Sequence, residues 1–309
     1  MRIAIIDLGT NTFNLLIVDV RTKDDFKSLF TTKTAVKLGE GGIIKKIIAP
    51  PAFARGIATL KSYKGIIDKL KAEKTIAFAT SAIRSSSNGA KFVAAAKKEA
   101  NIEINVISGD REAVLIFEGV KLGLDIGEKH SLILDIGGGS NEFVIADREG
   151  IVWKKSFDMG VARLLEQFKP SDPITVKEIE SLENYFKEVL APLFDAIKQY
   201  PVKELIGSSG SFDTFADMIA HQFKRVDQLK GKTEFTFDMN EFAIIHDQLV
   251  RSTKEERQKT QGIIDLRVDM IVIGTLITNF IIRELNITHM RLSTYALKQG
   301  ILADVMKRY

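Results

Sequence analysis

An internal repeat constrains the fold of this chain more than any other feature of its sequence. The segment "IAIIDLGTNTFNLLIVD" (residues 3–19) is matched by "LILDIGGGSNEFVIAD" (residues 132–147), and Asp7 aligns with Asp135 at an offset of 128 residues (135 − 7). In both copies an apolar strand ends in Asp-x-Gly, a short polar turn follows, and a second apolar strand comes next, which predicts a β-hairpin. A unit repeated at this distance predicts two similar domains.

The glycines of the second hairpin predict a phosphate-binding loop. A dinucleotide-binding fold would place a helix directly after such a loop, and a nucleotide-binding P-loop would end in Gly-Lys-Ser/Thr before a helix. Here the alternation of apolar and β-branched residues resumes at once in "NEFVIAD". We therefore expect a phosphate at the tip of a hairpin, with the two hairpins facing each other across a cleft.

The remainder of the chain reads as alternating strands and helices, which predicts an α/β protein. Strands are expected in "TIAFAT", "INVIS" and "ELIG". Helices are expected over 52–71, 89–100 (ended by Asn101), 111–123 (capped by Ser108), 176–199 (capped by Thr175), 212–223, 240–251, 266–285 and 295–308.

Several kinds of site are excluded or disfavoured by composition. The chain has no cysteine, which rules out disulfides, zinc-thiolate sites and thiol catalysis. Its four histidines are scattered without the spacing of metal ligands. The pair His246-Asp247 resembles a metal-phosphohydrolase dipeptide, but no second histidine stands where a metal would need it, and we interpret it as a helix surface pair.

The N-terminus and the charge pattern indicate a cytoplasmic protein with no nucleic-acid or membrane partner. The chain begins with a strand-like run and not with a signal peptide. The longest apolar stretch, residues 271–282, is shorter than the ~20 residues of a membrane span. The formal charge is +4 and the pI near 9.0, but the lysine pairs are dispersed, as on a solvated surface.

Four polar loops follow the ends of expected strands: "DLGTN" (7–11), "TSAIR" (80–84), "DIGGGSNE" (135–142) and "GSSGS" (207–211). Each offers backbone N–H groups or hydroxyls with little side-chain bulk, as phosphate-binding loops do. Glycine and serine also mark ordinary turns, and "GSSGS" by itself fits either interpretation.

Acidic residues and one arginine complete the candidates. Asp7, Asp135 and Glu142 are acidic candidates. The two aspartates end the repeated strands and are placed to hold hydrated Mg²⁺, an ion that uses only one or two carboxylates, or alternatively to cap turns; the repeat favours positioning of a metal or a water. Glu112 lies in the first turn of a helix, where the helix dipole alone explains a carboxylate. Arg84 suits a bidentate phosphate contact or an exposed surface position equally well.

These motifs together resemble the exopolyphosphatase / guanosine pentaphosphate phosphohydrolase family over residues 3–304. The resemblance is carried in order by "IIDLGTNTFNLLI", "VKLGEGG", "ATSAIR", "VISGDREAVLIFEGV", "LDIGGGSNEF" and "MGVARL", and more loosely by "GSSGSFDTFA", "RVDMIVIG" and "LSTYALKQGIL".

The resemblance implies two ribonuclease-H-like domains of the actin and sugar-kinase type around a central cleft, spanning 1–117 with 295–309 and 118–294. It implies Mg²⁺-dependent removal of the terminal phosphate of inorganic polyphosphate or guanosine pentaphosphate, and a homodimer. The resemblance also implies that Glu112, in "SGDREA", is the base or water-orienting residue. This overturns the interpretation that Glu112 only stabilises the helix dipole. Asp135 and Glu142 match metal positions. The implied phosphate-binding residues are Asn11, Arg84, Gly137, Gly138, Ser140, Gly210, Ser211 and Arg267.

Two departures and two alternatives accompany this prediction. The chain ends at Tyr309, without the additional C-terminal helical domains of longer members, which puts processivity on long polymers in doubt. The segment that is typically "ALREG" in the family reads "ALKQG" here, at residues 296–300. A sugar or acetate kinase of the same fold would need an organic acceptor and an adenosine pocket. A regulatory module would bind guanosine tetra- or pentaphosphate with little turnover.

Overall fold

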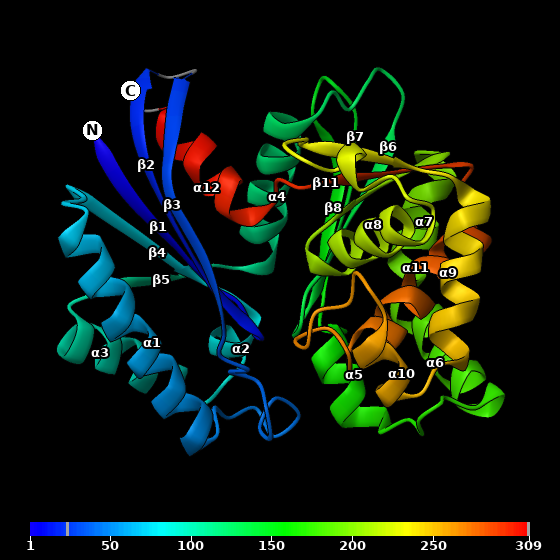
Figure 1. The fold of residues 1–309 in the computed structure, drawn as a ribbon, viewed down its shortest axis with the longest axis horizontal. Coiled ribbons are helices and arrows are strands. Elements are labelled where there is room, and N and C mark those ends of the chain that lie inside the picture. Colours follow the sequence, from blue (N-terminus) through cyan, green and yellow to red (C-terminus); the bar gives the residue numbers. More distant parts are fainter. Residues whose placement is uncertain (23–24, 308–309) are drawn as a thin grey trace.

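Two β-sheets, one in each half of the chain, form the framework of the protein. The computed structural model describes residues 1–22 and 25–307. Figure 1 shows the first sheet on the left and the second on the right. The strands are β1 (Arg2–Leu8), β2 (Thr12–Thr22), β3 (Asp25–Ala35), β4 (Lys74–Ala79), β5 (Ile104–Val106), β6 (Ser131–Ile136), β7 (Asn141–Ala146), β8 (Ile151–Phe157), β9 (Glu204–Ser208), β10 (Glu234–Phe237) and β11 (His289–Ser293).

The two sheets repeat one strand order. The first runs β3-β2-β1-β4-β5, and the second runs β8-β7-β6-β9-β11 with β10 added at its edge. In each sheet the first three strands form an antiparallel meander, and the next two pair in parallel with it. Both predicted hairpins are therefore confirmed, with Asp7 near the end of β1 and Asp135 near the end of β6. The predicted fold of two ribonuclease-H-like domains around a cleft is confirmed.

Helices cover the sheets, and their bounds are α1 (Pro50–Lys69), α2 (Ser81–Arg84), α3 (Gly89–Ala100), α4 (Gly109–Gly123), α5 (Val161–Phe168), α6 (Val176–Val189), α7 (Ala191–Gln199), α8 (Gly210–Gln222), α9 (Met239–Arg251), α10 (Lys254–Lys259), α11 (Ile271–Leu285) and α12 (Leu297–Met306). Most expected helices are confirmed. The expected helix over 176–199 is interrupted at Leu190, because Pro192 lacks the backbone N–H of a helix interior. The helix expected from 266 begins at Ile271, the loop "TSAIR" contains the turn of α2, and residue 308 of the expected last helix lies outside the described residues.

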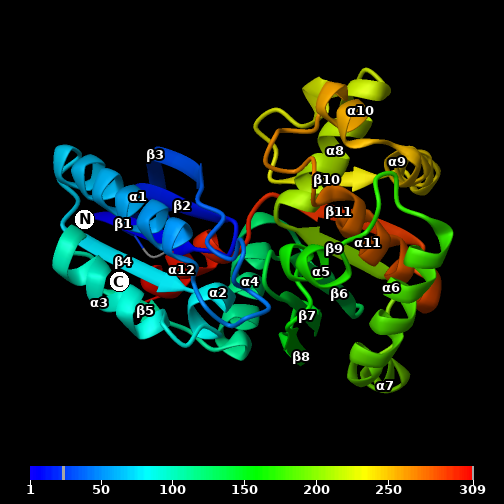
Figure 2. The same ribbon diagram turned by 90° about the horizontal axis from the view of Figure 1, so that it is seen from below.

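Alternation along β1 explains how the layers assemble. Ala4 and Ile6 face the core under α1 and α3, whereas Ile3 and Ile5 face α4 and α12, because successive side chains of a strand point to opposite faces. The α4–α12 layer also receives apolar residues of the second sheet, including Ile133. Figure 2 shows both helices between the sheets. Helix α4 continues without a break through the predicted domain boundary at 117/118, and the chain returns to the first half between β11 and α12.

Within the described residues, no helix is both long enough and apolar enough to cross a membrane.

Candidate active site

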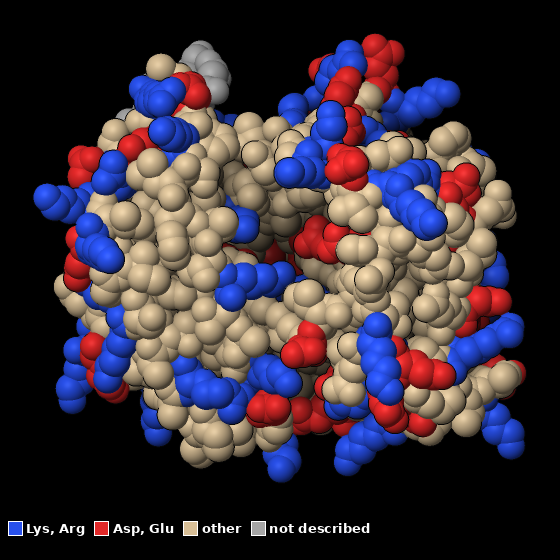
Figure 3. Space-filling view, in the orientation of Figure 1, with Lys and Arg blue, Asp and Glu red and all other residues tan. Residues whose placement is uncertain are grey.

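A cavity of about 160 Å³ lies between the two halves, at the ends of β1, β6 and β9. Figure 3 shows this hollow, with acidic side chains inside it and lysine and arginine side chains at its rim. Of the residues predicted from sequence, those lining it are Asp7, Asn11, Glu112, Asp135, Gly137, Gly138, Ser140, Glu142, Gly210 and Arg267. Arg84 and Ser211 do not line it.

The glycine loop after β6 is shaped by the helix behind it. The carbonyl of Gly137 accepts a hydrogen bond from the N–H of Val161 at 2.9 Å, and the carbonyl of Gly138 accepts from the N–H groups of Ala162 and Arg163 at 2.9 and 3.1 Å. The carbonyl of Gly139 accepts from Nε of Arg163 at 2.9 Å. Because all three carbonyls are bound by α5, the peptide dipoles of this loop present their N–H ends away from α5, as an anion-binding loop requires.

Loops from the two halves meet directly in the cavity. A Cβ atom on Gly138 would lie 2.5 Å from Nδ2 of Asn11, and one on Gly139 would lie 2.5 Å from Oγ1 of Thr10 and 2.6 Å from Oγ of Ser81. Only glycine leaves room for this contact. Asn11 also donates from Nδ2 to Sδ of Met270 at 2.8 Å, so the first loop touches the second half at two points.

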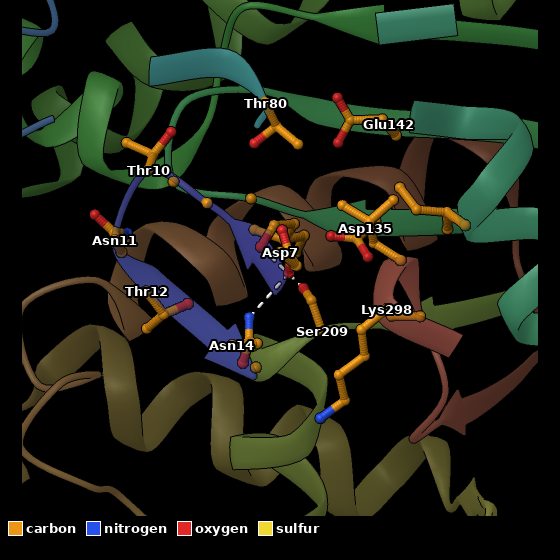
Figure 4. A pocket seen from close by; sticks show the side chains of 18 of the residues that line it. Asp7, Thr10, Asn11, Thr12, Asn14, Thr80, Asp135, Glu142, Ser209 and Lys298 are labelled. Carbon is orange, nitrogen blue, oxygen red and sulfur yellow. Dashed lines mark hydrogen bonds between the residues drawn. The ribbon is translucent and has the colours of Figure 1, made fainter. Parts of the chain in front are cut away.

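Three carboxylates from the two repeated hairpins line the cavity. Asp135 and Glu142 are paired across the β6–β7 hairpin, and Asp7 reaches them from β1 (Figure 4). Asp135 accepts a hydrogen bond from Ser208 at 2.8 Å, and Glu142 accepts one from Ser156 at 2.6 Å. Burial raises the pKa of Glu142 to about 7, with repulsion from Asp135 as the next cause.

Burial also disfavours the ionised forms of Asp7 and Asp135. Burial raises the pKa of Asp7 to about 6, although a hydrogen bond that Asn14 donates to it at 2.9 Å lowers this pKa. Burial also raises the pKa of Asp135. Although Asp7 as a residue is half-buried, its Oδ1 atom is enclosed and has no hydrogen-bond partner among the described residues. A cluster of desolvated carboxylates with an unused oxygen favours binding of a cation.

Glu112 and Arg84 form an ion pair beside the carboxylate cluster. Ser108 caps α4 by accepting from the N–H of Arg111, which places Glu112 in the first turn, and Glu112 is 6% exposed. Arg84, at the end of α2, donates to Oε2 of Glu112 at 2.9 Å and to the carbonyl of Ile107 at 3.1 Å. Burial and then repulsion from Glu142 raise the pKa of Glu112, whereas Arg84 lowers it. The prediction that Arg84 contacts phosphate stays a prediction; here its side chain contacts Glu112.

The "GSSGS" segment forms the N-terminus of α8. A Cβ atom on Gly210 would collide with the guanidinium of Arg267, the nearest atom lying at 1.6 Å, so Arg267 lies flat against this N-terminus. Ser211 is buried, and its hydroxyl faces Gly274 of α11 and not the cavity. Any contact of Ser211 with phosphate would therefore use its backbone N–H.

Several cavity residues lie outside the predicted set. Lys33 from β3, Asp213 from α8 and Lys298 from α12 line the same cavity. Lys298 stands in the "ALKQG" segment, so a sequence signal for it existed; Lys33 and Asp213 carry no motif. They reach the cavity only because β3 pairs beside β2 and because α8 begins at its edge.

The carboxylates fit a magnesium ion. Within the described residues no group of three or more His, Cys, Asp or Glu side chains forms a ready metal site. Mg²⁺, however, keeps several waters and needs only one or two protein carboxylates, with substrate phosphates as further ligands. Asp135, Glu142 and the free Oδ1 of Asp7 supply oxygen ligands of the kind that this ion prefers.

Comparison with known proteins identifies the family of this chain. The profile described as the Ppx/GppA phosphatase family matches residues 16–309. The chain belongs to the Ppx/GppA phosphatase family.

Proteins named as phosphatases stand among those that are similar to this chain. The chain is 33% identical over 285 residues to the bifunctional 3-dehydroquinate synthase/phosphatase of Fusobacterium nucleatum subsp. nucleatum, a match that covers 89% of this chain and 42% of that protein. It thus spans less than half the length of that relative. It is 25% identical over 304 residues to exopolyphosphatase 1 of Mycobacterium tuberculosis, covering 98% of this chain and 87% of that protein.

A solved structure extends the likeness to three dimensions. The crystal structure of an exopolyphosphatase from Cytophaga hutchinsonii superimposes with a TM-score of 0.97 at 40% identity, over 100% of this chain and 98% of that one. The Ppx/GppA family thus accounts for the order of the motifs predicted from sequence and for the pair of domains around the cavity.

Proposed function

We propose that this protein is a phosphatase that hydrolyses terminal phosphoanhydride bonds and releases orthophosphate from inorganic polyphosphate or guanosine pentaphosphate. One observation carries the proposal: glycine-rich and hydroxyl-rich loops of both halves meet around a cavity whose wall holds buried Glu112, which is paired with half-buried Arg84 behind it. Membership of a phosphatase family and the exopolyphosphatases among the similar proteins support phosphatase action on polyphosphate.

In the proposed reaction the loops position the terminal phosphate. Phosphoryl transfer requires positioning and charge neutralisation more than covalent chemistry from the enzyme. The N–H groups of Gly137 and Gly138, the amide of Asn11 and the N-terminus of α8 would bind its oxygens and stabilise charge that develops on them.

Glu112 would orient and deprotonate the attacking water. A general base works best when its pKa lies near the operating pH, and burial raises the pKa of Glu112 above its ordinary acidic range, in the direction of that condition. Arg84 counteracts the raised pKa, which keeps a share of Glu112 ionised, and the same guanidinium is suited to phosphate contact. No side-chain nucleophile is needed in this scheme.

Asp135 and Glu142 would hold Mg²⁺, with Asp7 as a further acceptor. When bound, the ion would neutralise negative charge on the phosphate oxygens. The two carboxylates would fix the position of the ion, because a hydrogen bond holds each of them to a neighbouring strand. Ser208 donates to Asp135, and Ser156 donates to Glu142.

The direct test measures orthophosphate release from tripolyphosphate, long-chain polyphosphate and guanosine pentaphosphate, with Mg²⁺ and with chelator. Release from one of them with Mg²⁺, lost in the Glu112→Gln variant, is the expected result. Binding without release would favour the regulatory module, and transfer of phosphate to an added acceptor instead of water would favour a kinase. The relative rates on the three substrates decide the substrate preference.

A further inference from the structure

The cavity has an acidic end and a basic end. Glu112 and Glu142 lie at one end, where Glu142 and Arg84 act on the charge of Glu112, and Asp135 and Arg84 act on that of Glu142. Lys33 and Lys298 act electrostatically on Asp7, in the middle. Figure 4 shows Glu142 and Lys298 on opposite sides of Asp7 and Asp135.

The three cations of the basic end, Lys33, Arg267 and Lys298, have no hydrogen bond or ion pair from their side chains within the described part of the chain. Lys33 is exposed, Lys298 is half-buried and Arg267 is buried. Burial lowers the pKa of Lys298 and of Arg267, so these cations are held where water solvates them poorly. Together with the N-terminus of α8 they form a cation ring that suits the anionic part of a substrate next to its terminal phosphate.

A carboxylate shares the cavity with this cation ring. Asp213 lies in the first turn of α8 and lines the cavity, and its side chain likewise has no hydrogen bond or ion pair among the described residues. Lys33, Arg267 and Lys298 are the cations that act on it. Burial nevertheless raises its pKa to about 6, so the carboxylate is desolvated without being paired. An anion at this place reduces the positive charge that the ring presents to a polyanion.

We propose that Asp213 is a specificity-determining residue, which makes the cation ring select short phosphoanhydride substrates over long polyphosphate. This inference rests on the proposed function. With the terminal phosphate at the glycine loop, the adjoining phosphates reach the ring, and each further phosphate adds negative charge near the Asp213 carboxylate. Juxtaposed like charges disfavour the wrong partner, which is how a fixed charge creates specificity. A short substrate ends before this repulsion accumulates.

The test compares Asp213→Asn with a matched control, Asp217→Asn. Asp217 lies one turn further along α8, is exposed, and does not line the cavity. KM and kcat are measured with tripolyphosphate and with long-chain polyphosphate at pH 8, where Asp213 is ionised. Asp213→Asn should lower the ratio of the long-chain KM to the tripolyphosphate KM by about tenfold, through KM and not kcat. Asp217→Asn should leave the ratio unchanged.

Three results would overturn the inference: an unchanged KM ratio in Asp213→Asn, the same change in Asp217→Asn, or a higher KM for every substrate. The last would indicate that the carboxylate accepts hydrogen bonds from substrate. Equilibrium binding of both polyphosphates, measured by calorimetry on the same variants, keeps the inference separate from the proposed function. If no variant releases orthophosphate, the proposed function fails, and the affinity ratio for long and short chains still decides the role of Asp213.

Discussion

Replacing Glu142 by glutamine should stabilise the protein at the expense of its activity. The side chain is 1% exposed, and burial raises its pKa to about 7. A carboxyl whose pKa is raised on folding contributes stability that is present below its ordinary pKa of 4.5 and is lost as the pH rises through 7. The difference between these values corresponds to about 3 kcal/mol at roughly 1.36 kcal/mol per pH unit. Glutamine carries no charge and still accepts the hydrogen bond from Ser156.

We therefore expect Glu142→Gln to raise the free energy of unfolding at pH 8 by up to about 3 kcal/mol, and at pH 5 by less than about 1 kcal/mol. Urea unfolding followed by the fluorescence of Trp153, the only tryptophan, measures this, because Trp153 pairs with Ile145 of the same strand as Glu142. Exposed Glu149, substituted by glutamine in the turn after that strand, is the control. Equal effects at both pH values, or destabilisation at pH 8, would refute the reasoning.

The same pair of proteins tests the metal assignment. A ligand that binds only the folded state stabilises it by mass action. Mg²⁺ should raise the urea midpoint of the wild type at pH 8 and raise that of Glu142→Gln much less. Equal shifts in both proteins would argue against Glu142 as a ligand.

Three other substitutions address the remaining parts of the site. Glu112→Gln should keep polyphosphate affinity, measured by calorimetry, and lower kcat by about 10²–10⁴-fold; near-normal turnover would contradict its role. Arg84→Gln removes the cation that lowers the pKa of Glu112, so the acidic limb of the pH–rate profile should move to higher pH, and an unmoved limb would count against the pair. Gly160→Ala puts a Cβ 2.4 Å from the backbone of the glycine loop and should raise KM for polyphosphate at least several-fold, whereas Gly65→Ala, in open space on α1, should leave KM unchanged.

Much of the fold could be predicted from local pattern. The Asp-x-Gly hairpins, the caps at Ser108 and Thr175 and the left-handed end of a helix at Asn101 are set by neighbouring residues, and all are present in the structure. The break at Leu190 and the short helix α10 were missed because a single proline and a six-residue helix leave weak periodic signals. The homodimer and the cytoplasmic location stay predictions.

The site itself divides between sequence and tertiary structure. The sequence alone determined that two glycine-bearing hairpins exist, that Asp7 and Asp135 end equivalent strands, and that the chain resembles phosphoanhydride hydrolases, because these properties depend on residues close together in the chain. Only the tertiary structure decided that Arg84 pairs with Glu112 and that Lys33, Arg267 and Lys298 line the same cavity as Asp213. Those residues come from distant elements, and their charges and burial depend on how the two sheets pack around α4 and α12.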